Sequence, residues 1–306
     1  ENYKKKNFKT AEIYCYKILS IDSNHFDSLS LLATIAAVNT DFSKAKELLI
    51  KAVSIQPGNV AAIHNLATTY KELGDLKQSI NYYKKVLQIE PKHINGHYNL
   101  GLVFHKLDEL KKAKDYLKKT TELQDNYALA FFSLANVNNE LKEYNDAISN
   151  YQRSIELNPN IVAAHNNLGL VFRNLNDFKS AVSSYENAIK INPKHAGAHH
   201  NLAITLKEGG FFDKSIKSHL LAIKHEPENL AHYHFLSELK EDILNQDLKN
   251  KIKKILLNKE TRDINSAYGN YLLAKYERAK KNYKEEIHYL IKGHNNFFKS
   301  RKKKFE

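Results

Sequence analysis

The sequence is poor in cysteine, proline and glycine. Cys15 is the only cysteine among 306 residues, so an internal disulfide and a cysteine-based zinc site are both excluded. We expect Cys15 to act as a small buried apolar side chain. Only 10 glycines and 5 prolines interrupt the chain, and such sparse punctuation favours helices joined by tight turns over a many-stranded sheet.

Long apolar runs are also missing. The longest, LSLLATIAAV at 29–38, is far shorter than the roughly 20 residues that a membrane helix needs, so we expect no membrane span. The opening ENYKKKNFKT has no apolar core of a signal peptide, which favours a cytoplasmic protein. Because the sequence does not begin with Met, a leader removed earlier stays an open alternative.

Arginine is scarce although the chain is basic. The formal net charge is +13, yet only 5 of the 47 basic residues are arginine. Lysine lacks the bidentate fork that is favoured at phosphates and bases. The densest basic runs, at 4–6, 251–254 and 301–304, lie near the ends or outside the regular repeats. We therefore favour solvated lysine faces over a nucleic-acid interface, which stays a minor alternative.

The five prolines recur with a fixed period. Their spacings are 34, 68, 34 and 34 residues, and the double gap holds Asp125 at its midpoint. A fixed period of this length is typical of arrays of one supersecondary unit. The prolines are Pro57, Pro91, Pro159, Pro193 and Pro227.

Each period predicts two amphipathic helices. In residues 60–93, Ile63, Leu66, Ala67 and Tyr70 form an i, i+3, i+4, i+7 stripe. The Gly-Asp pair at 74–75 then predicts a turn of about two residues before a second stripe. Small residues recur at one register of the second helix, where a larger side chain would hold the paired helices apart. They are Ala45, Ser79, Ala113, Ala147, Ala181 and Ser215.

This pattern resembles the tetratricopeptide repeat. The resemblance implies an all-α fold, a right-handed solenoid of antiparallel helix pairs, and an interaction scaffold. It covers six units over 26–229, preceded in 1–25 by a truncated unit whose second helix lies at 8–23. The residues that carry it are Leu66-Ala67, Tyr70, Tyr83 and Pro91, and their equivalents Leu168-Gly169, Phe172, Ala181, Tyr185, Ala188 and Pro193.

The array loosens after the last proline. We predict a divergent helical segment over 230–263 and a degenerate helical hairpin with a basic tail over 264–306. From Tyr271 onward the sequence resembles the region that joins tetratricopeptide arrays to the catalytic domain of bacterial sulfotransferases. Glu286 departs from the repeat, because it stands where a small residue is expected. The similarity is carried by Leu273-Ala274-Lys275, Asn282-Tyr283 and Gly293-His294-Asn295.

An asparagine recurs at one register of the first helices, directly before the Leu-Gly or Leu-Ala pair. The packing stripe uses other positions, and the resemblance places this row inside a concave groove. It is similar to the asparagine ladder of O-linked N-acetylglucosamine transferases. One carboxamide offers a donor and an acceptor, which matches a peptide backbone whatever its side chains. The row is Asn65, Asn99, Asn167 and Asn201, with Ser133 interrupting it.

Polar and aromatic side chains flank the asparagines. We expect them to give specificity to a polar, somewhat cationic groove lining. The alternative is that each asparagine caps a neighbouring helix or merely meets water. The flanking residues are His64, Tyr98, Asn166 and His200 one position earlier, and Lys71, His105, Arg173 and Lys207 a turn and a half later.

Catalytic motifs are missing. We find no Gly-rich phosphate loop, no nucleophile elbow and no phosphosulfate-binding loop, and therefore predict no catalytic residue and no cofactor. His195 and His199 have the i, i+4 spacing of a metal pair. Because His199 shares its register with His97 and His165, the repeat explains it better, and we predict no metal site.

The sequence thus predicts a non-catalytic bacterial scaffold whose partner is a protein or an extended peptide. The alternative is a substrate-recruiting or dimerising region of a sulfotransferase whose catalytic domain lies beyond residue 306. The two readings can coexist, and homo-oligomer formation stays open.

Overall fold

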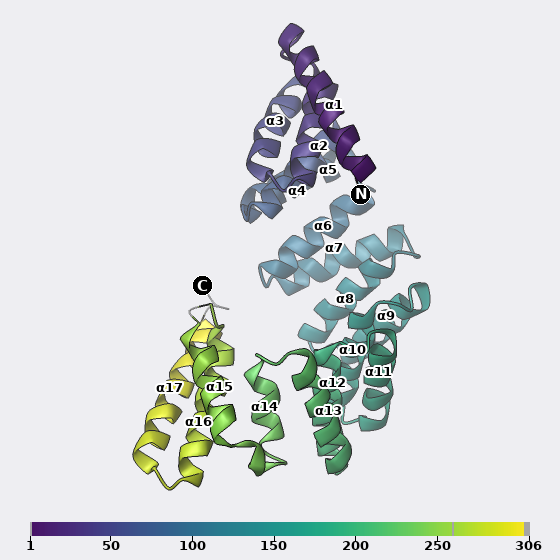
Figure 1. The fold of residues 1–306 in the computed structure, drawn as a ribbon. Coiled ribbons are helices and arrows are strands. Elements are labelled where there is room, and N and C mark those ends of the chain that lie inside the picture. Colours follow the sequence, from purple (N-terminus) through teal and green to yellow (C-terminus); the bar gives the residue numbers. More distant parts are fainter. Residues whose placement is uncertain (1, 259, 303–306) are drawn as a thin grey trace. The chain divides into compact units, whose positions relative to one another are not determined.

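The computed structural model describes residues 2–258 and 260–302, with side chains at 8–258 and 260–301. Over these residues the chain is all-helical, with 17 α-helices and no strand, which confirms the predicted fold class (Figure 1). The chain divides into two compact units, 1–157 and 158–306, which are described separately. The basic runs at 4–6 and 302–304 fall outside the described side chains.

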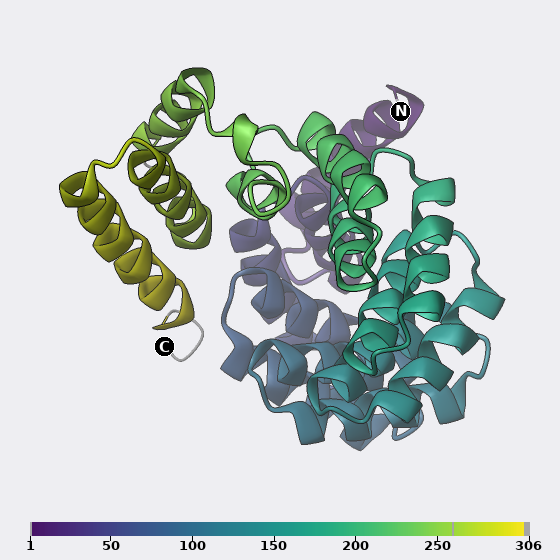
Figure 2. The ribbon, with the colours of Figure 1, turned by 90° about the horizontal axis from the view of Figure 1, so that it is seen from below.

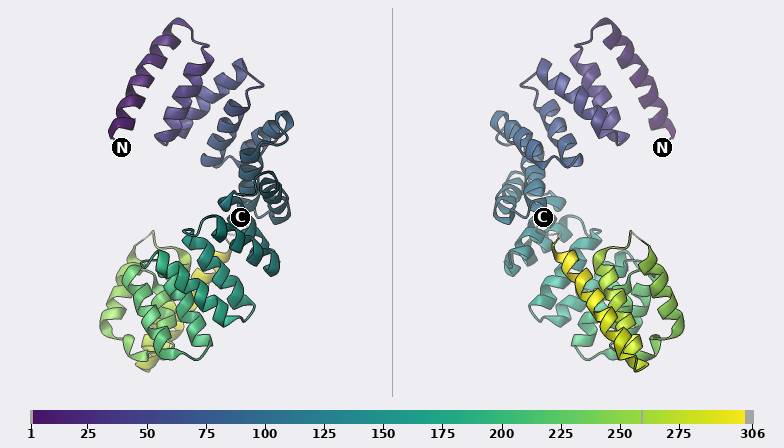
Figure 3. Two further views of the ribbon diagram at one scale, coloured as in Figure 1. Left: turned by 90° about the vertical axis from the view of Figure 1, so that its right-hand side faces the viewer. Right: turned by 90° about the vertical axis from the view of Figure 1, so that its left-hand side faces the viewer.

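The first unit is a long single helix followed by four helical hairpins. In every hairpin a first helix of 13 residues packs on a second helix of 14 residues. Within this unit the hairpins follow one another in sequence order (Figure 3). The helices are α1 (Asn2–Ile21), α2 (Phe26–Val38), α3 (Phe42–Ile55), α4 (Val60–Glu72), α5 (Leu76–Ile89), α6 (Ile94–Lys106), α7 (Leu110–Leu123), α8 (Ala128–Glu140) and α9 (Tyr144–Leu157).

The second unit begins with two hairpins of the same helix lengths and ends differently. The hairpins are α10 (Val162–Asn174) with α11 (Phe178–Ile191), and α12 (Ala196–Glu208) with α13 (Phe212–His225). Three shorter elements follow, which are α14 (Leu230–Leu236), a 3-10 turn (Glu241–Ile243) and α15 (Gln246–Leu257). The long pair α16 (Asp263–Ala279) and α17 (Tyr283–Lys302) completes the unit (Figure 2).

Every hairpin closes with the same turn. In the α4–α5 turn Gly74 has φ of 82°, and the Asp75 N–H donates to the Tyr70 carbonyl at 3.0 Å, as in a Schellman motif. Three residues separate the helix ends instead of the predicted two, because Asp75 is itself the N-cap of α5. A left-handed residue stands at each turn: Thr40, Gly74, Asp108, Lys142, Asn176, Gly210 and Lys281.

Small residues allow the two helices of a hairpin to approach closely. The six small residues predicted at this register of the second helices are all completely buried. On the facing first helix, a Cβ added to Gly169 would lie 2.6 Å from the ring of Tyr185. The structure therefore explains the Leu-Gly and Leu-Ala pairs by close helix packing.

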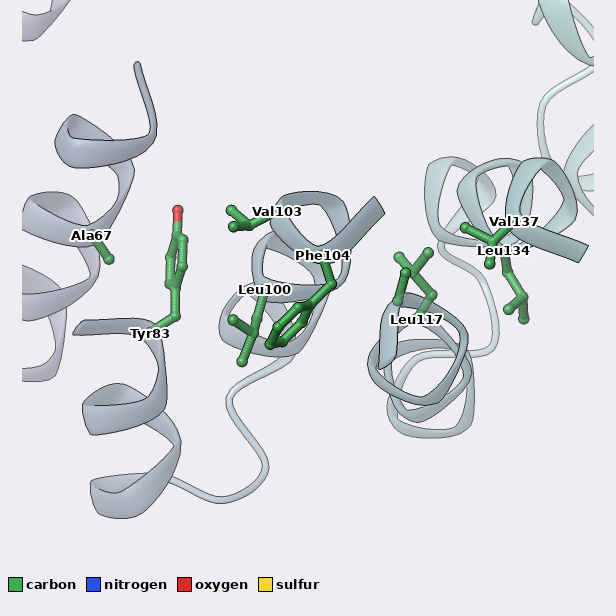
Figure 4. Close-up of a cluster of buried hydrophobic side chains, with 9 residues drawn as sticks. Ala67, Tyr83, Leu100, Val103, Phe104, Leu117, Leu134 and Val137 are labelled. Carbon is green, nitrogen blue, oxygen red and sulfur yellow. The ribbon is translucent and has the colours of Figure 1, made fainter. Parts of the chain in front are cut away.

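The hydrophobic core of the first unit continues from hairpin to hairpin. Tyr83 of α5, Leu100 of α6 and Leu117 of α7 belong to one buried cluster and are completely buried (Figure 4). Each hairpin therefore depends on its neighbours for stability. Cys15 of α1 is buried, as predicted.

The end of the second unit is held together by charges as well as by apolar contacts. Helix α16 packs on α14, α15 and α17. The Lys249 ammonium of α15 lies 2.6 Å from the Glu277 carboxylate of α16, and the Asn282 amide also donates to that carboxylate at 3.1 Å. Because Glu277 is only 5% exposed, this ion pair fixes α15 on the surface of α16.

Candidate functional site

In the first unit, Asn99 connects two neighbouring first helices. Its side-chain amide donates to the Asn95 carbonyl at 3.0 Å and to His64 Nε2 of α4 at 3.3 Å. Lys71 of α4 donates to Asn99 Oδ1 at 3.4 Å. Burial lowers the pKa of His64, which keeps its ring neutral and able to accept. Asn65, on the same face of α4, is exposed.

The next contacts in this unit involve the flanking residues of α6. The Tyr98 hydroxyl lies 3.4 Å from Ser133 Oγ of α8, and its ring packs 5.0 Å from that of Tyr127. His105 Nε2 lies 2.9 Å from the Glu140 carboxylate of α8. Ser133, which interrupts the asparagine row, is thus a buried partner of Tyr98.

In the second unit the amides form a short chain. Asn201 Nδ2 of α12 donates to Asn166 Oδ1 of α10 at 3.0 Å, and Asn166 Nδ2 donates to Asn167 Oδ1 at 3.1 Å. Asn166 is 9% exposed, so this bond satisfies a buried polar group. None of these three side chains is the N-cap of a helix. Their amides therefore join first helices to one another.

The predicted cations occupy the last turns of α4, α6, α10 and α12 and differ in their partners. The Lys207 ammonium lies 2.5 Å from Glu238, and the Lys71 ammonium lies 3.3 Å from Glu72. Arg173 Nη1, by contrast, is buried with no hydrogen-bond partner among the described residues. The hydroxyl of Tyr185 is also buried, and burial raises its pKa to about 12.

A histidine cluster that the sequence did not predict lies beside this register. His200 Nδ1 is 3.2 Å from His232 Nδ1, and the His200 ring packs 5.5 Å from His219 and 5.1 Å from Phe235. Burial lowers the pKa of His200 to about 3 and the pKa values of His219 and His234 to about 4. Register comparison could have shown it, because His219 stands where Tyr83 and Tyr185 stand in other units.

The histidines weighed as a metal pair have structural roles. His195 Nδ1 accepts from the Ala198 N–H as the N-cap of α12. His199 Nε2 lies 3.0 Å from the Pro193 carbonyl, and His97 and His165 contact the prolines six residues before them in the same way. No group of three or more potential metal ligands occurs among the described residues.

A cleft of about 1010 Å³ opens in the second unit between the turn before α14 and helices α15 and α16. Several of its polar lining groups are used within the fold. Lys251 donates to the Tyr233 hydroxyl at 2.5 Å, and the Asn265 side chain accepts from the Leu230 N–H at 2.7 Å. The sequence had given no signal of this cleft, because it arises where the 34-residue spacing is lost.

Comparison with protein families identifies the repeats. A family profile described as TPR repeat matches residues 67–108 and 135–175. Two profiles described as tetratricopeptide repeat match residues 94–127 and 162–195. The chain contains tetratricopeptide repeats. The matched segments end before the divergent region, so the resemblance of residues after Tyr271 to a sulfotransferase junction stays a prediction.

Solved structures agree with this repeat architecture. The MamA protein is 26% identical and covers 56% of this chain and 93% of its own, with a TM-score of 0.52. YrrB, described as a TPR protein with an unusual peptide-binding site, is 24% identical over 62% of this chain and 98% of its own, with a TM-score of 0.55. PilF of Pseudomonas aeruginosa is 19% identical over 70% and 97%, with a TM-score of 0.61.

A search of curated proteins gave no match to the chain. Among the described helices, none has both the length and the apolar character needed to cross a membrane.

Proposed function

We propose that the tetratricopeptide repeats form a non-catalytic scaffold that binds an extended peptide along the asparagine register. The observation that supports this most strongly is the contact between first helices one repeat apart. Asn99 reaches His64 in the first unit, and Asn201 reaches Asn166 in the second. Polar groups able to donate and accept are therefore placed at regular intervals across neighbouring first helices.

The bonds between these side chains prepare them for binding. A carboxamide has two N–H donors and an oxygen with two lone pairs, and Asn201 Nδ2 uses one donor on Asn166. The second donor and the oxygen give this amide further capacity for a peptide backbone. Because the side chains are already fixed, less conformational entropy is lost on binding.

The amides alone would bind weakly. At about 1 kcal/mol net for each hydrogen bond, four asparagines supply on the order of 4 kcal/mol, which corresponds to about millimolar affinity. Neighbouring side chains must supply the rest. The side chain of Arg173, which is partly exposed, favours a peptide with a carbonyl or carboxylate at that point.

A binding titration with a double variant tests the proposal. The probes are labelled peptides selected on the wild-type protein from a random 12-residue library. We expect Asn99→Ala with Asn167→Ala to weaken each peptide by about 2 kcal/mol, or about thirtyfold, because two backbone bonds are lost. The loss should be similar for peptides of unrelated sequence, since backbone groups are common to all.

The matched control removes two amides from second helices. Asn145→Ala with Asn187→Ala changes the same chemistry at exposed positions of α9 and α11, and peptide affinity should not change. Thermal melts of both variants separate binding from folding. Equal peptide affinity in the wild type and the Asn99/Asn167 variant would reject the proposed register, and unfolding of that variant would assign the asparagines a structural role instead.

A further inference from the structure

Helix α17 carries an exposed apolar stripe. Tyr283, Ile287, Ile291 and Phe298 are 61%, 57%, 56% and 66% exposed. Their spacings of four, four and seven residues place them on one face of the helix. Single exposed apolar residues are ordinary, but four on one helical face mark a surface for interaction.

The same register is covered by a helix in the regular hairpins. In the α10–α11 hairpin, Val182 stands six residues after the left-handed residue Asn176. Val182 packs against the cluster that contains Leu202 and Leu206 of the next first helix. Ile287 likewise stands six residues after the left-handed residue Lys281. Tyr283 and Ile287 therefore stand at registers whose equivalents in the first unit, Leu76 and Ile80, pack against a buried cluster that includes residues of the next first helix. Ile291 and Phe298 extend this apolar face along α17.

A basic edge runs beside the apolar stripe. Each of the four stripe residues is followed directly by a basic residue, so the basic side chains form a second line along the helix. The three lysines are exposed, and they form no ion pair with another described residue. The edge consists of Lys284, His288, Lys292 and Lys299.

We propose that this surface of α17 docks an amphipathic helix of a partner protein whose apolar face is bordered by Asp and Glu. The apolar stripe would bury the partner's apolar face, and the lysine edge would pair with its acids. A second copy of this chain fits poorly, because it would bring the same lysines and a net charge of +13. A lipid surface is less suited than a helix, because Tyr283 and Ile287 repeat registers that pack against a neighbouring hairpin elsewhere in the fold. This surface is separate from the asparagine register.

Two designed peptides of 18 residues test both features of the surface. They share one leucine stripe at helical spacing and differ only in the flanking residues, which are Glu in one and Lys in the other. Fluorescence anisotropy should show binding of the Glu peptide and little binding of the Lys peptide. Ile287→Asp should weaken the Glu peptide about tenfold or more, since an apolar contact is replaced by a like charge. Lys292→Glu should weaken the Glu peptide and strengthen the Lys peptide.

The controls separate this surface from general charge and from the peptide register. Lys253→Glu makes the same charge change at an exposed position of α15, and Asn99→Ala with Asn167→Ala removes the register amides. Both should bind the Glu peptide as the wild type does. If Ile287→Asp lowers the melting temperature, Ile291→Ser provides a milder second variant.

Several outcomes would overturn the proposal. One is equal binding of the Glu and Lys peptides, and another is wild-type affinity in both the Ile287 and Ile291 variants. Concentration-dependent dimerisation that Ile287→Asp abolishes would assign the stripe to a second copy. Binding to vesicles containing anionic lipid, without binding to the Glu peptide, would assign it to a membrane surface.

Discussion

The regular hairpins and the final α16–α17 hairpin share a turn but differ in what they bury. Four residues before the left-handed residue, the regular units have Tyr70 and Phe172, whereas the last hairpin has Glu277. Five residues after it, the regular units have small residues and the last has Glu286. The contrast shows that all hairpins share the turn geometry and not the helix length, and that the interior can be apolar or charged if a counter-ion is supplied.

The largest change in unfolding free energy is expected when a glutamate is placed inside a regular hairpin, compared with removing the glutamate of the last hairpin. Ala181→Glu places a carboxylate at a completely buried position and should cost more than about 4 kcal/mol of unfolding free energy, because the charge has no partner there. Glu286→Ala should change stability by less than about 1 kcal/mol, since the Glu286 carboxylate lies 3.7 Å from a mostly exposed Arg278. Urea melts of both variants measure the difference. Similar losses of unfolding free energy in the two variants would show that the regular hairpins tolerate a buried charge as well as the last hairpin does.

Removing one partner of the Lys249–Glu277 pair should have the next largest effect. Lys249→Met leaves a buried carboxylate without its ammonium, and breaking such a pair costs roughly 3 kcal/mol or more. Hydrogen exchange should rise in α15 and α16 and stay unchanged in the first unit. Lys249→Met combined with Glu277→Leu should recover most of the loss, since no isolated charge remains; failure of this rescue would show that the pair is not what fixes α15.

Acid should destabilise the second unit more than the first. His200, His219 and His234 have pKa values of about 3, 4 and 4 in the fold, against about 6.5 unfolded. Their contribution is complete above pH 6.5 and is lost as the pH falls towards 4, because the unfolded chain then binds more protons. For each of these histidines the expected loss by pH 4.5 is roughly 2 to 3 kcal/mol.

Charged groups near the three histidines also affect their pKa values, and a substitution of one histidine provides a control. His232, Glu238, Lys207, Lys275 and Arg173 contribute to the pKa shifts of the three histidines. Hydrogen exchange at pH 7 and pH 4.5 should show opening in residues 196–240 before residues 60–106. His219→Tyr, which restores the residue type of the other units, should reduce the difference. Simultaneous opening of both regions would argue against the histidines as the cause.

The smallest effect concerns the shared turn. Lys281 has φ of 59°, a conformation that glycine adopts without the steric cost of a Cβ. Lys281→Gly should therefore stabilise the last hairpin by about 0.5 to 1 kcal/mol. Gly210→Ala, at the equivalent turn, should destabilise by a similar amount. Differential scanning calorimetry of the two variants checks the opposite signs.

The sequence was sufficient for the fold because its signals are repeated. A period of 34 residues and one register of small residues predict hairpins that the structure confirms, including the burial of Ala45 and Ala113. After Pro227 the sequence predicted a divergent helical segment over 230–263 and a degenerate hairpin over 264–306, without the contacts that hold them together. The attachment of α15 uses apolar contacts of Leu248 and Ile252 and the ion pair of Lys249 with Glu277. These contacts occur only once in the chain, so no periodic pattern predicts them.

The candidate site was predictable as a register and not as a set of bonds. Sequence spacing places Asn201 and Asn166 on neighbouring first helices, but the direction of each amide depends on side-chain rotamers and on what lies opposite. The structure shows Asn201 donating to Asn166, whereas the equivalent residue Asn99 donates to His64. The role of the row in binding a peptide stays a prediction.

The bonds between first helices also bear on how the chain folds during its synthesis. Both His64 to Asn99 and Asn166 to Asn201 join residues 35 positions apart. Contacts of such short range close small loops, which favours fast folding, and a growing chain can complete each one as soon as the next first helix has left the ribosome. The α16–α17 hairpin follows all of them in the sequence, and until α16 has been synthesised the face of α14 that it covers remains exposed.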